Sequence, residues 1–139
     1  MNSTLFVYGT LRRGATEGES DALLRGATYL GPARTGGRLY DLGRYPGLVP
    51  SDAQGASVRG EVHLLADPAR ALADLDRYEG CAPDDRQPHE YERVEREVLL
   101  DSGDVVTAWL YAYARPIDAA HEIPSGDWLA ECARRRRAP

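Results

Sequence analysis

The strongest constraint on the fold of this chain is a pair of long extended segments, residues 91–100 and 105–114. The four-residue link between them contains Gly103 and is typical of a hairpin turn. In the second segment neither alternating face is strongly polar, because valine, tryptophan, tyrosine, alanine and leucine fill most positions. We therefore expect this strand to be central in a sheet or to lie inside a small barrel.

Further elements follow from capping residues and apolar patterns. Asp67 and Pro68 predict the start of a helix, because aspartate caps helix N-termini and proline suits the first position. The helix is expected to run to about Glu79, where Gly80 can adopt the left-handed conformation that ends helices. The other expected elements are a buried strand over 5–8, a helical turn or two over 21–25, brief extended islands at 39–40 and 48–49 within a Gly- and Pro-rich stretch over 36–55, a strand over 57–65, and a helix over 127–137.

The chain length of 139 residues suits one domain with a sizeable core and is short for two. We expect a single domain over residues 1–133 and an arginine-rich, disordered tail over 134–139. No apolar run is long enough to cross a bilayer, and the N-terminal residues lack the features of a signal peptide. Two cysteines, Cys81 and Cys132, make no disulfide framework, so a reducing cytoplasm is the expected location.

The charge balance excludes several classes of function. Acidic residues outnumber basic ones by 22 to 17, which argues against a general nucleic-acid-binding protein and leaves only the arginine tail as a candidate for such contacts. All basic residues are arginines, so chemistry that needs a lysine is excluded. His63, His89 and His121 give no metal-binding spacing with the cysteines, and we expect neither a metal nor another cofactor.

One acidic residue has an unusual place in the expected helix. At about 100° per residue, Leu72, Leu75 and Glu79 fall on one stripe, so a carboxylate ends an otherwise apolar face. It also lies in the last turn, where the helix dipole disfavours negative charge. Two interpretations are open: Glu79 is a solvated residue at the helix end, or it is a buried acid with a functional role.

The strand over 5–8 runs directly into Gly9, which Thr10 and Leu11 follow. A strand that turns at a glycine exposes successive main-chain N–H groups, which can bind an anion or stabilise an oxyanion. Glycine allows a ligand to approach the main chain closely. Taken alone, the same residues are also typical of an ordinary turn.

Taken together, five segments resemble the γ-glutamylcyclotransferase-like family, which includes the γ-glutamylamine cyclotransferases. They occur in the family's order and extend from about residue 5 to residue 113. The segments are FVYGTLRRG at 6–14, GEV at 60–62, LDRYEG at 75–80, YER at 91–93 and VVTAWLY at 105–111.

The resemblance implies an α+β fold, namely a small, mixed, partly closed β-barrel with short flanking helices. It implies a pocket where the loop after the first strand meets the end of the helix. There Glu79 matches the family's acid/base, and residues 8–11 match its substrate-binding loop. That loop consists of Tyr8, Gly9, Thr10 and Leu11. From the last strand, Tyr113 is a candidate to line the pocket, and Tyr111 a weaker one.

The implied reaction is intramolecular: the α-amine of a small γ-glutamyl compound attacks its own γ-carbonyl, forming 5-oxoproline and releasing an amine or amino acid. Burial would raise the pKa of Glu79 to a value suited to proton transfer, and the turn at Gly9 would supply oxyanion donors. No covalent nucleophile is needed. The alternative is a module that binds γ-glutamyl compounds on the same fold without turning them over.

Several residues are weaker candidates. Cys81 lies close to Glu79 but lacks a partner that would activate its thiol. Glu92 is a second candidate carboxylate, and Arg93 or Arg38 is a candidate to hold the substrate's α-carboxylate. The link over 80–90 is longer than the family's usual one, so it bears on the leaving group rather than on the cyclisation.

Overall fold

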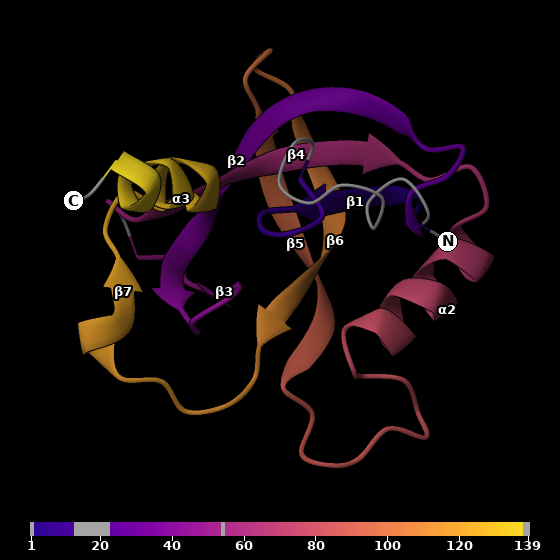
Figure 1. Ribbon diagram of the computed structural model, residues 1–139. Helices are drawn as coiled ribbons and strands as arrows, with labels where there is room; N and C mark the ends of the chain where they lie inside the picture. The colour runs from indigo at the N-terminus through magenta and orange to yellow at the C-terminus, as the bar shows by residue number, and fades with distance from the viewer. Residues whose placement is uncertain (1, 13–22, 54, 138–139) are drawn as a thin grey trace.

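The computed structural model describes residues 2–12, 23–53 and 55–137. Its strands form one mixed sheet that curls into a barrel, with helices at its periphery (Figure 1). The elements are β1 (Thr4–Val7), β2 (Thr28–Asp41), β3 (Pro46–Pro50), β4 (Ser57–Leu64), α2 (Pro68–Tyr78), β5 (Tyr91–Leu100), β6 (Val105–Tyr113), the single 3-10 turn η1 (Ala119–His121), β7 (Glu122–Ile123) and α3 (Trp128–Arg137).

Five strands close the barrel in the order β1, β4, β2, β5 and β6, with β6 returning to β1. The β1–β6 pairing is parallel and short, at Leu5 and Trp109, whereas the neighbouring pairings in this ring are antiparallel. The β2–β5 contact is also short, because β2 bends away from β5 and continues beside β3. The expected mixed, partly closed β-barrel with flanking helices is therefore confirmed.

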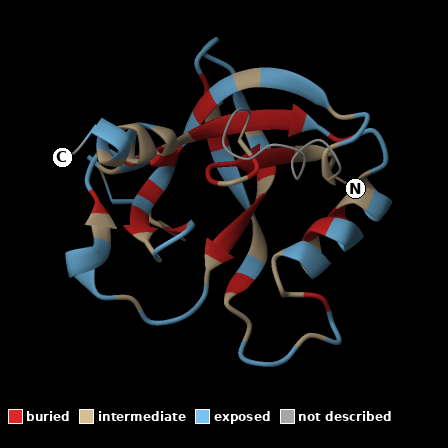
Figure 2. Ribbon diagram, viewed as in Figure 1, coloured by how far each residue is buried: buried red, intermediate tan, exposed pale blue. Residues whose placement is uncertain are grey.

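Two apolar clusters hold the fold together. One fills the barrel around fully buried side chains such as Phe6, Leu48 and Leu110. The other lies between the barrel and α2, where Leu72 and Leu75 form the inner face of the helix (Figure 2). This second cluster fixes α2 against the strands, and the end of α2 is consequently held beside the end of β1.

Strand β2 differs most from the sequence-based expectation. Brief extended islands were expected between residues 36 and 55, but β2 is continuous through Gly36 and Gly37 as far as Asp41. A Cβ on Gly36 would lie 2.6 Å from the Ser51 carbonyl oxygen, and one on Gly37 would lie 2.7 Å from that of Val49. Because the main chains approach so closely here, only glycine fits at these two positions of the strand. The low strand propensity of glycine therefore led the sequence analysis to expect a broken strand where β2 is continuous.

The observed helices agree with the sequence-based expectation more closely than β2 does. Asp67 caps α2, its side chain accepting a hydrogen bond from the Arg70 N–H, and the helix ends one residue before Glu79. The disordered tail expected over 134–139 is wrong for residues 134–137, which continue α3; Arg134 there pairs with Glu131 at 2.6 Å. The first two residues of the turn expected over 21–25 lie outside the described residues. The last two residues of the expected tail, 138–139, also lie outside them. No described helix is long and apolar enough to cross a membrane.

Candidate functional site

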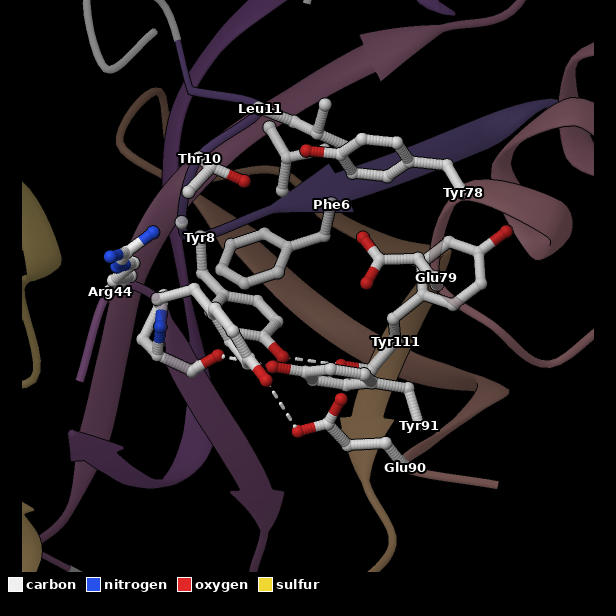
Figure 3. A pocket seen from close by; sticks show the side chains of 14 residues that line it. Phe6, Tyr8, Thr10, Leu11, Arg44, Tyr78, Glu79, Glu90, Tyr91 and Tyr111 are labelled. Atoms are coloured by element: carbon white, nitrogen blue, oxygen red, sulfur yellow. Dashed lines mark hydrogen bonds between the residues drawn. The ribbon is translucent and has the colours of Figure 1, made fainter. Parts of the chain in front are cut away.

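A cavity of about 500 Å³ opens where the end of β1, the segment before β3 and the end of α2 meet. The carboxyl group of Glu79 points into it from the side of α2, while Thr10 and Arg44 lie opposite (Figure 3). The cavity is lined by Phe6, Val7, Tyr8, Gly9, Thr10, Leu11, Arg44, Tyr45, Pro46, Tyr78, Glu79, Glu90, Tyr91 and Tyr111. The structure thus brings together the two features that the sequence singled out, Glu79 and residues 8–11.

The residues after β1 form a tight turn, closed by a hydrogen bond from the Arg12 N–H to the Gly9 carbonyl oxygen at 3.0 Å. A β-turn leaves the N–H groups of its two central residues without an internal acceptor, here Thr10 and Leu11. Within the described part of the chain, no acceptor is found for either group. The turn therefore supplies main-chain donors at the edge of the cavity.

Packing and an ion pair fix this turn from outside. A Cβ on Gly9 would lie 2.8 Å from the Pro46 ring, so glycine permits the contact with the segment before β3. The Arg12 guanidinium donates to Asp127, just before α3, at 2.8 Å. Since the Arg12 side chain is only 11% exposed, this pair links the turn firmly to the C-terminal helix.

Glu79 is the C-cap residue of α2 and is nevertheless largely shielded from water. The helix ends in a Schellman motif: the Gly80 N–H donates to Arg77 and the Cys81 N–H donates to Asp76. Burial, with a smaller contribution from the nearby charge of Glu90, raises the pKa of Glu79 to about 7. The interpretation of Glu79 as a buried acid is favoured over that of a solvated cap.

The Schellman motif makes Gly80 a test of how the end of α2, and with it Glu79, is held. Its φ of 76° lies in the left-handed region, and a Cβ there would meet nothing within 4 Å. Gly80→Ala is expected to lower the free energy of unfolding by about 1 kcal/mol through backbone strain alone. Urea denaturation measures this loss. Gly80→Asn should lose less stability, because asparagine tolerates the left-handed conformation. Equal stability of the alanine variant and the unsubstituted protein would contradict the left-handed conformation of Gly80.

Buried tyrosines form the floor of the cavity. The Tyr8 hydroxyl donates to the Tyr111 carbonyl oxygen at 2.5 Å and accepts from the Leu48 N–H at 3.2 Å. The Tyr91 hydroxyl donates to the Pro46 carbonyl oxygen at 2.7 Å. Burial raises the pKa of both phenols well above their ordinary value. Both hydroxyls therefore stay protonated at neutral pH, and neither can act as a base. Tyr8 contributes its ring and its bonds to the main chain.

Sequence reasoning missed two charged residues that line the cavity, Arg44 and Glu90. Glu90 accepts a hydrogen bond from the Tyr45 hydroxyl at 2.7 Å, and this contact raises the pKa of Tyr45 to about 12. Both candidate arginines are engaged elsewhere: Arg38 pairs with Glu122 and Arg93 with Asp76. The signal for Arg44 was weak, because it lies in the Gly- and Pro-rich stretch whose path the sequence did not define.

Other expected site residues lie outside the cavity lining. Tyr113 does not line the cavity, and its ring packs edge-on against Tyr91, whereas Tyr111 does line it. Glu92 is exposed on β5. Burial raises the pKa of the Cys81 thiol to about 11, which makes it a poor nucleophile. Within the described ranges no group of three or more potential metal ligands occurs.

Comparisons with known proteins agree on one family. Residues 5–130 match the family model described as gamma-glutamyl cyclotransferase, AIG2-like. A gamma-glutamylcyclotransferase family protein of Escherichia coli K12 is 36% identical over 127 residues, covering 90% of this chain and 95% of that protein. The structure of YkqA from Bacillus subtilis superimposes with a TM-score of 0.74 at 29% identity, over 99% of this chain and 44% of that one. An aig2-like protein from Mus musculus shares the fold, with a TM-score of 0.57 at 23% identity, over 91% of this chain and 93% of that one.

Proposed function

The chain belongs to the gamma-glutamyl cyclotransferase, AIG2-like family, and on this premise we propose that it converts a small γ-glutamyl compound into 5-oxoproline and a free amine or amino acid. One observation carries the proposal. A largely shielded carboxyl group with a pKa of about 7 faces, across the cavity, a turn whose two central N–H groups have no acceptor among the described residues. Such a pair suits proton transfer on one side of a reacting amide and charge stabilisation on the other.

In the proposed mechanism Glu79 carries protons from the attacking nitrogen to the departing one. Its carboxylate takes a proton from the substrate's α-ammonium group, whose ordinary pKa is near 8. The freed amine attacks the γ-carbonyl carbon, a C–N bond forms, and the carbonyl oxygen becomes an oxyanion. When this intermediate collapses, the original amide C–N bond breaks and protonated Glu79 gives its proton to the departing nitrogen. The attacking nitrogen still carries one proton more than the lactam keeps; the Glu79 carboxylate takes this second proton and passes it to the released amine, which leaves as an ammonium ion. No water is consumed, and Glu79 ends as it began.

The turn and the cavity walls supply the remaining contributions. The N–H groups of Thr10 and Leu11 are the proposed donors to the oxyanion, and the loss of one such donor typically lowers a rate by about 10²–10³-fold. The cavity walls, which include Phe6 and Leu11, would fold the glutamyl arm back on itself and keep its two reacting groups in contact. Tyr111, near the C-terminal end of β6, completes the wall beside Glu79.

The experiment that tests the function is incubation with a panel of γ-glutamyl amines and γ-glutamyl amino acids. The expected result is release of 5-oxoproline and of one equivalent of amine from at least one of them, above the spontaneous rate without protein. Chromatography with mass detection measures both products. Binding of panel members without any product would overturn the proposal in favour of a non-catalytic module that binds γ-glutamyl compounds.

The pH dependence of kcat/KM should show an acid limb set by Glu79. Activity is expected to fall with a slope of one below about pH 7, because the base becomes protonated there. Glu90→Gln removes the like charge that helps to raise the pKa of Glu79, so the limb should move to lower pH. Steady-state rates at a series of pH values measure both. An acid limb near pH 4.5 in the unsubstituted protein would contradict the role of burial at Glu79.

A further inference from the structure

Asp76 is a charged residue close to the cavity that the mechanism leaves without a role. Its carboxylate accepts three hydrogen bonds: from the Tyr111 hydroxyl at 2.6 Å, and from Nε and Nη2 of Arg93 at 2.8 and 3.2 Å. Asp76 belongs to α2, whereas its partners belong to β6 and β5. The carboxylate therefore links the helix that carries Glu79 to the wall of the barrel.

The same network continues to the other side of the cavity. Tyr111 binds Asp76 with its hydroxyl, and its main-chain carbonyl oxygen accepts the hydrogen bond from Tyr8. Tyr8 directly precedes Gly9, at the start of the turn that presents the Thr10 and Leu11 N–H groups to the cavity. Tyr111 thus contacts both α2, which carries Glu79, and the segment that leads into the turn at Gly9.

The position of Asp76 in the helix suits it to control Glu79. It lies three residues before Glu79, and its main-chain carbonyl oxygen accepts the Cys81 N–H of the Schellman motif. Its side chain is 17% exposed and that of Arg93 26%, and the Arg93 guanidinium lies over the Trp109 ring, 4.4 Å from its centroid. Charge-assisted bonds in so sheltered a place are stronger than those of surface ion pairs.

We propose that Asp76 is a positioning residue for Glu79: through Tyr111 and Arg93 it holds the last turn of α2 against the barrel, which keeps the Glu79 carboxyl group shielded from water and at a fixed distance from the turn at Gly9. Asp76 is not among the residues that line the cavity, so it acts through Glu79 and not on the substrate. The proposal rests on the proposed function in so far as it concerns catalysis.

The test compares the full chain with Asp76→Asn and Tyr111→Phe. In a titration followed by ¹³C NMR, the Glu79 carboxyl, assigned by its absence in Glu79→Gln, should titrate at lower pH in both variants because water reaches it. Tyr111→Phe changes no charge, so a shift in that variant reports shielding and not electrostatics. For Asp76→Asn, kcat should fall about 10- to 100-fold while KM changes less, as expected for a misplaced reacting group.

Asp101→Asn is the matched control, since it breaks a two-bonded pair with Arg59, at 3.0 Å, that is remote from the cavity. It should leave the Glu79 titration and kcat unchanged. If Asp76→Asn and Tyr111→Phe lower the melting temperature but leave the Glu79 titration as in the original protein, the positioning role is wrong. The titration needs no substrate, so it tests the positioning role of Asp76 even if no γ-glutamyl compound is turned over. A complete lack of turnover would reject the proposed function and not the positioning role.

Discussion

Replacing Glu79 with glutamine is expected to lower the rate of 5-oxoproline formation by about 10²–10⁴-fold, the usual contribution of a positioned acid–base group. Glutamine keeps the size and shape of the side chain but can neither take the ammonium proton nor return one to the departing amine. Product release from a turned-over γ-glutamyl compound measures the loss. Glu92→Gln, which neutralises an exposed carboxylate outside the cavity, should retain full activity.

The same substitution should leave the protein as stable or make it more stable, with a definite pH dependence. The pKa of Glu79 is about 7 in the folded protein and ordinary in the unfolded chain, so folding opposes its ionisation. The destabilisation is small below the unfolded pKa, grows as pH rises, and is complete above about pH 7. Glu79→Gln should therefore raise the free energy of unfolding by up to about 3 kcal/mol at mildly alkaline pH and by much less near pH 5.

A variant of Glu79 that kept full activity would reject the proposed role of this residue outright. A variant that lost both activity and stability at alkaline pH would show that the carboxylate is needed for packing. Thermal unfolding of both proteins over a range of pH separates these outcomes from the expected one, in which activity falls and stability does not.

The largest effect on stability is expected at Gly60, in β4 opposite the end of β1. A Cβ there would collide with the main-chain oxygen of Val7 and would lie 2.6 Å from Cζ of Phe6, which is itself fully buried. Because a main-chain atom is involved, no side-chain rotation relieves the clash, and β1 must move away from β4. Gly60→Ala is expected to lower the free energy of unfolding by roughly 3 kcal/mol or more.

Urea denaturation measures this loss, and Ser57→Ala, at an exposed position of the same strand, should change stability by less than about 0.5 kcal/mol. Since β1 leads into residues 8–11, the folded fraction of Gly60→Ala should also turn over substrate more slowly. Stability equal to that of the unsubstituted protein would show that β1 and β4 do not approach as closely as described.

The sequence predicted the part of the site that depends on local structure. The capping pair Asp67 and Pro68 fixed the start of α2 and therefore the stripe that ends in Glu79. A helix end and a strand end need few long-range contacts to be recognised, and each carries distinctive residues. The strands over 91–100 and 105–113 followed from alternation and a turn signal in the same way.

The rest of the cavity depends on contacts between distant segments. Arg44 lies between β2 and β3, and its position follows from the close approach of Gly36 and Gly37 to β3, which no local pattern indicates. Alternation places Tyr111 and Tyr113 on the same face of β6, so it could not show that Tyr111 lines the cavity and that Tyr113 packs behind Tyr91. Such choices depend on where along a strand the neighbouring helix ends.

The most direct test of the central claim is a crystal structure of Glu79→Gln with a bound γ-glutamyl compound that the unsubstituted protein turns over. We expect the γ-carbonyl oxygen to lie about 3 Å from main-chain N–H groups of the turn at Gly9, with the α-amine beside the side chain at position 79. A glutamyl group bound outside this cavity, or bound within it with its amine remote from that side chain, would contradict the account.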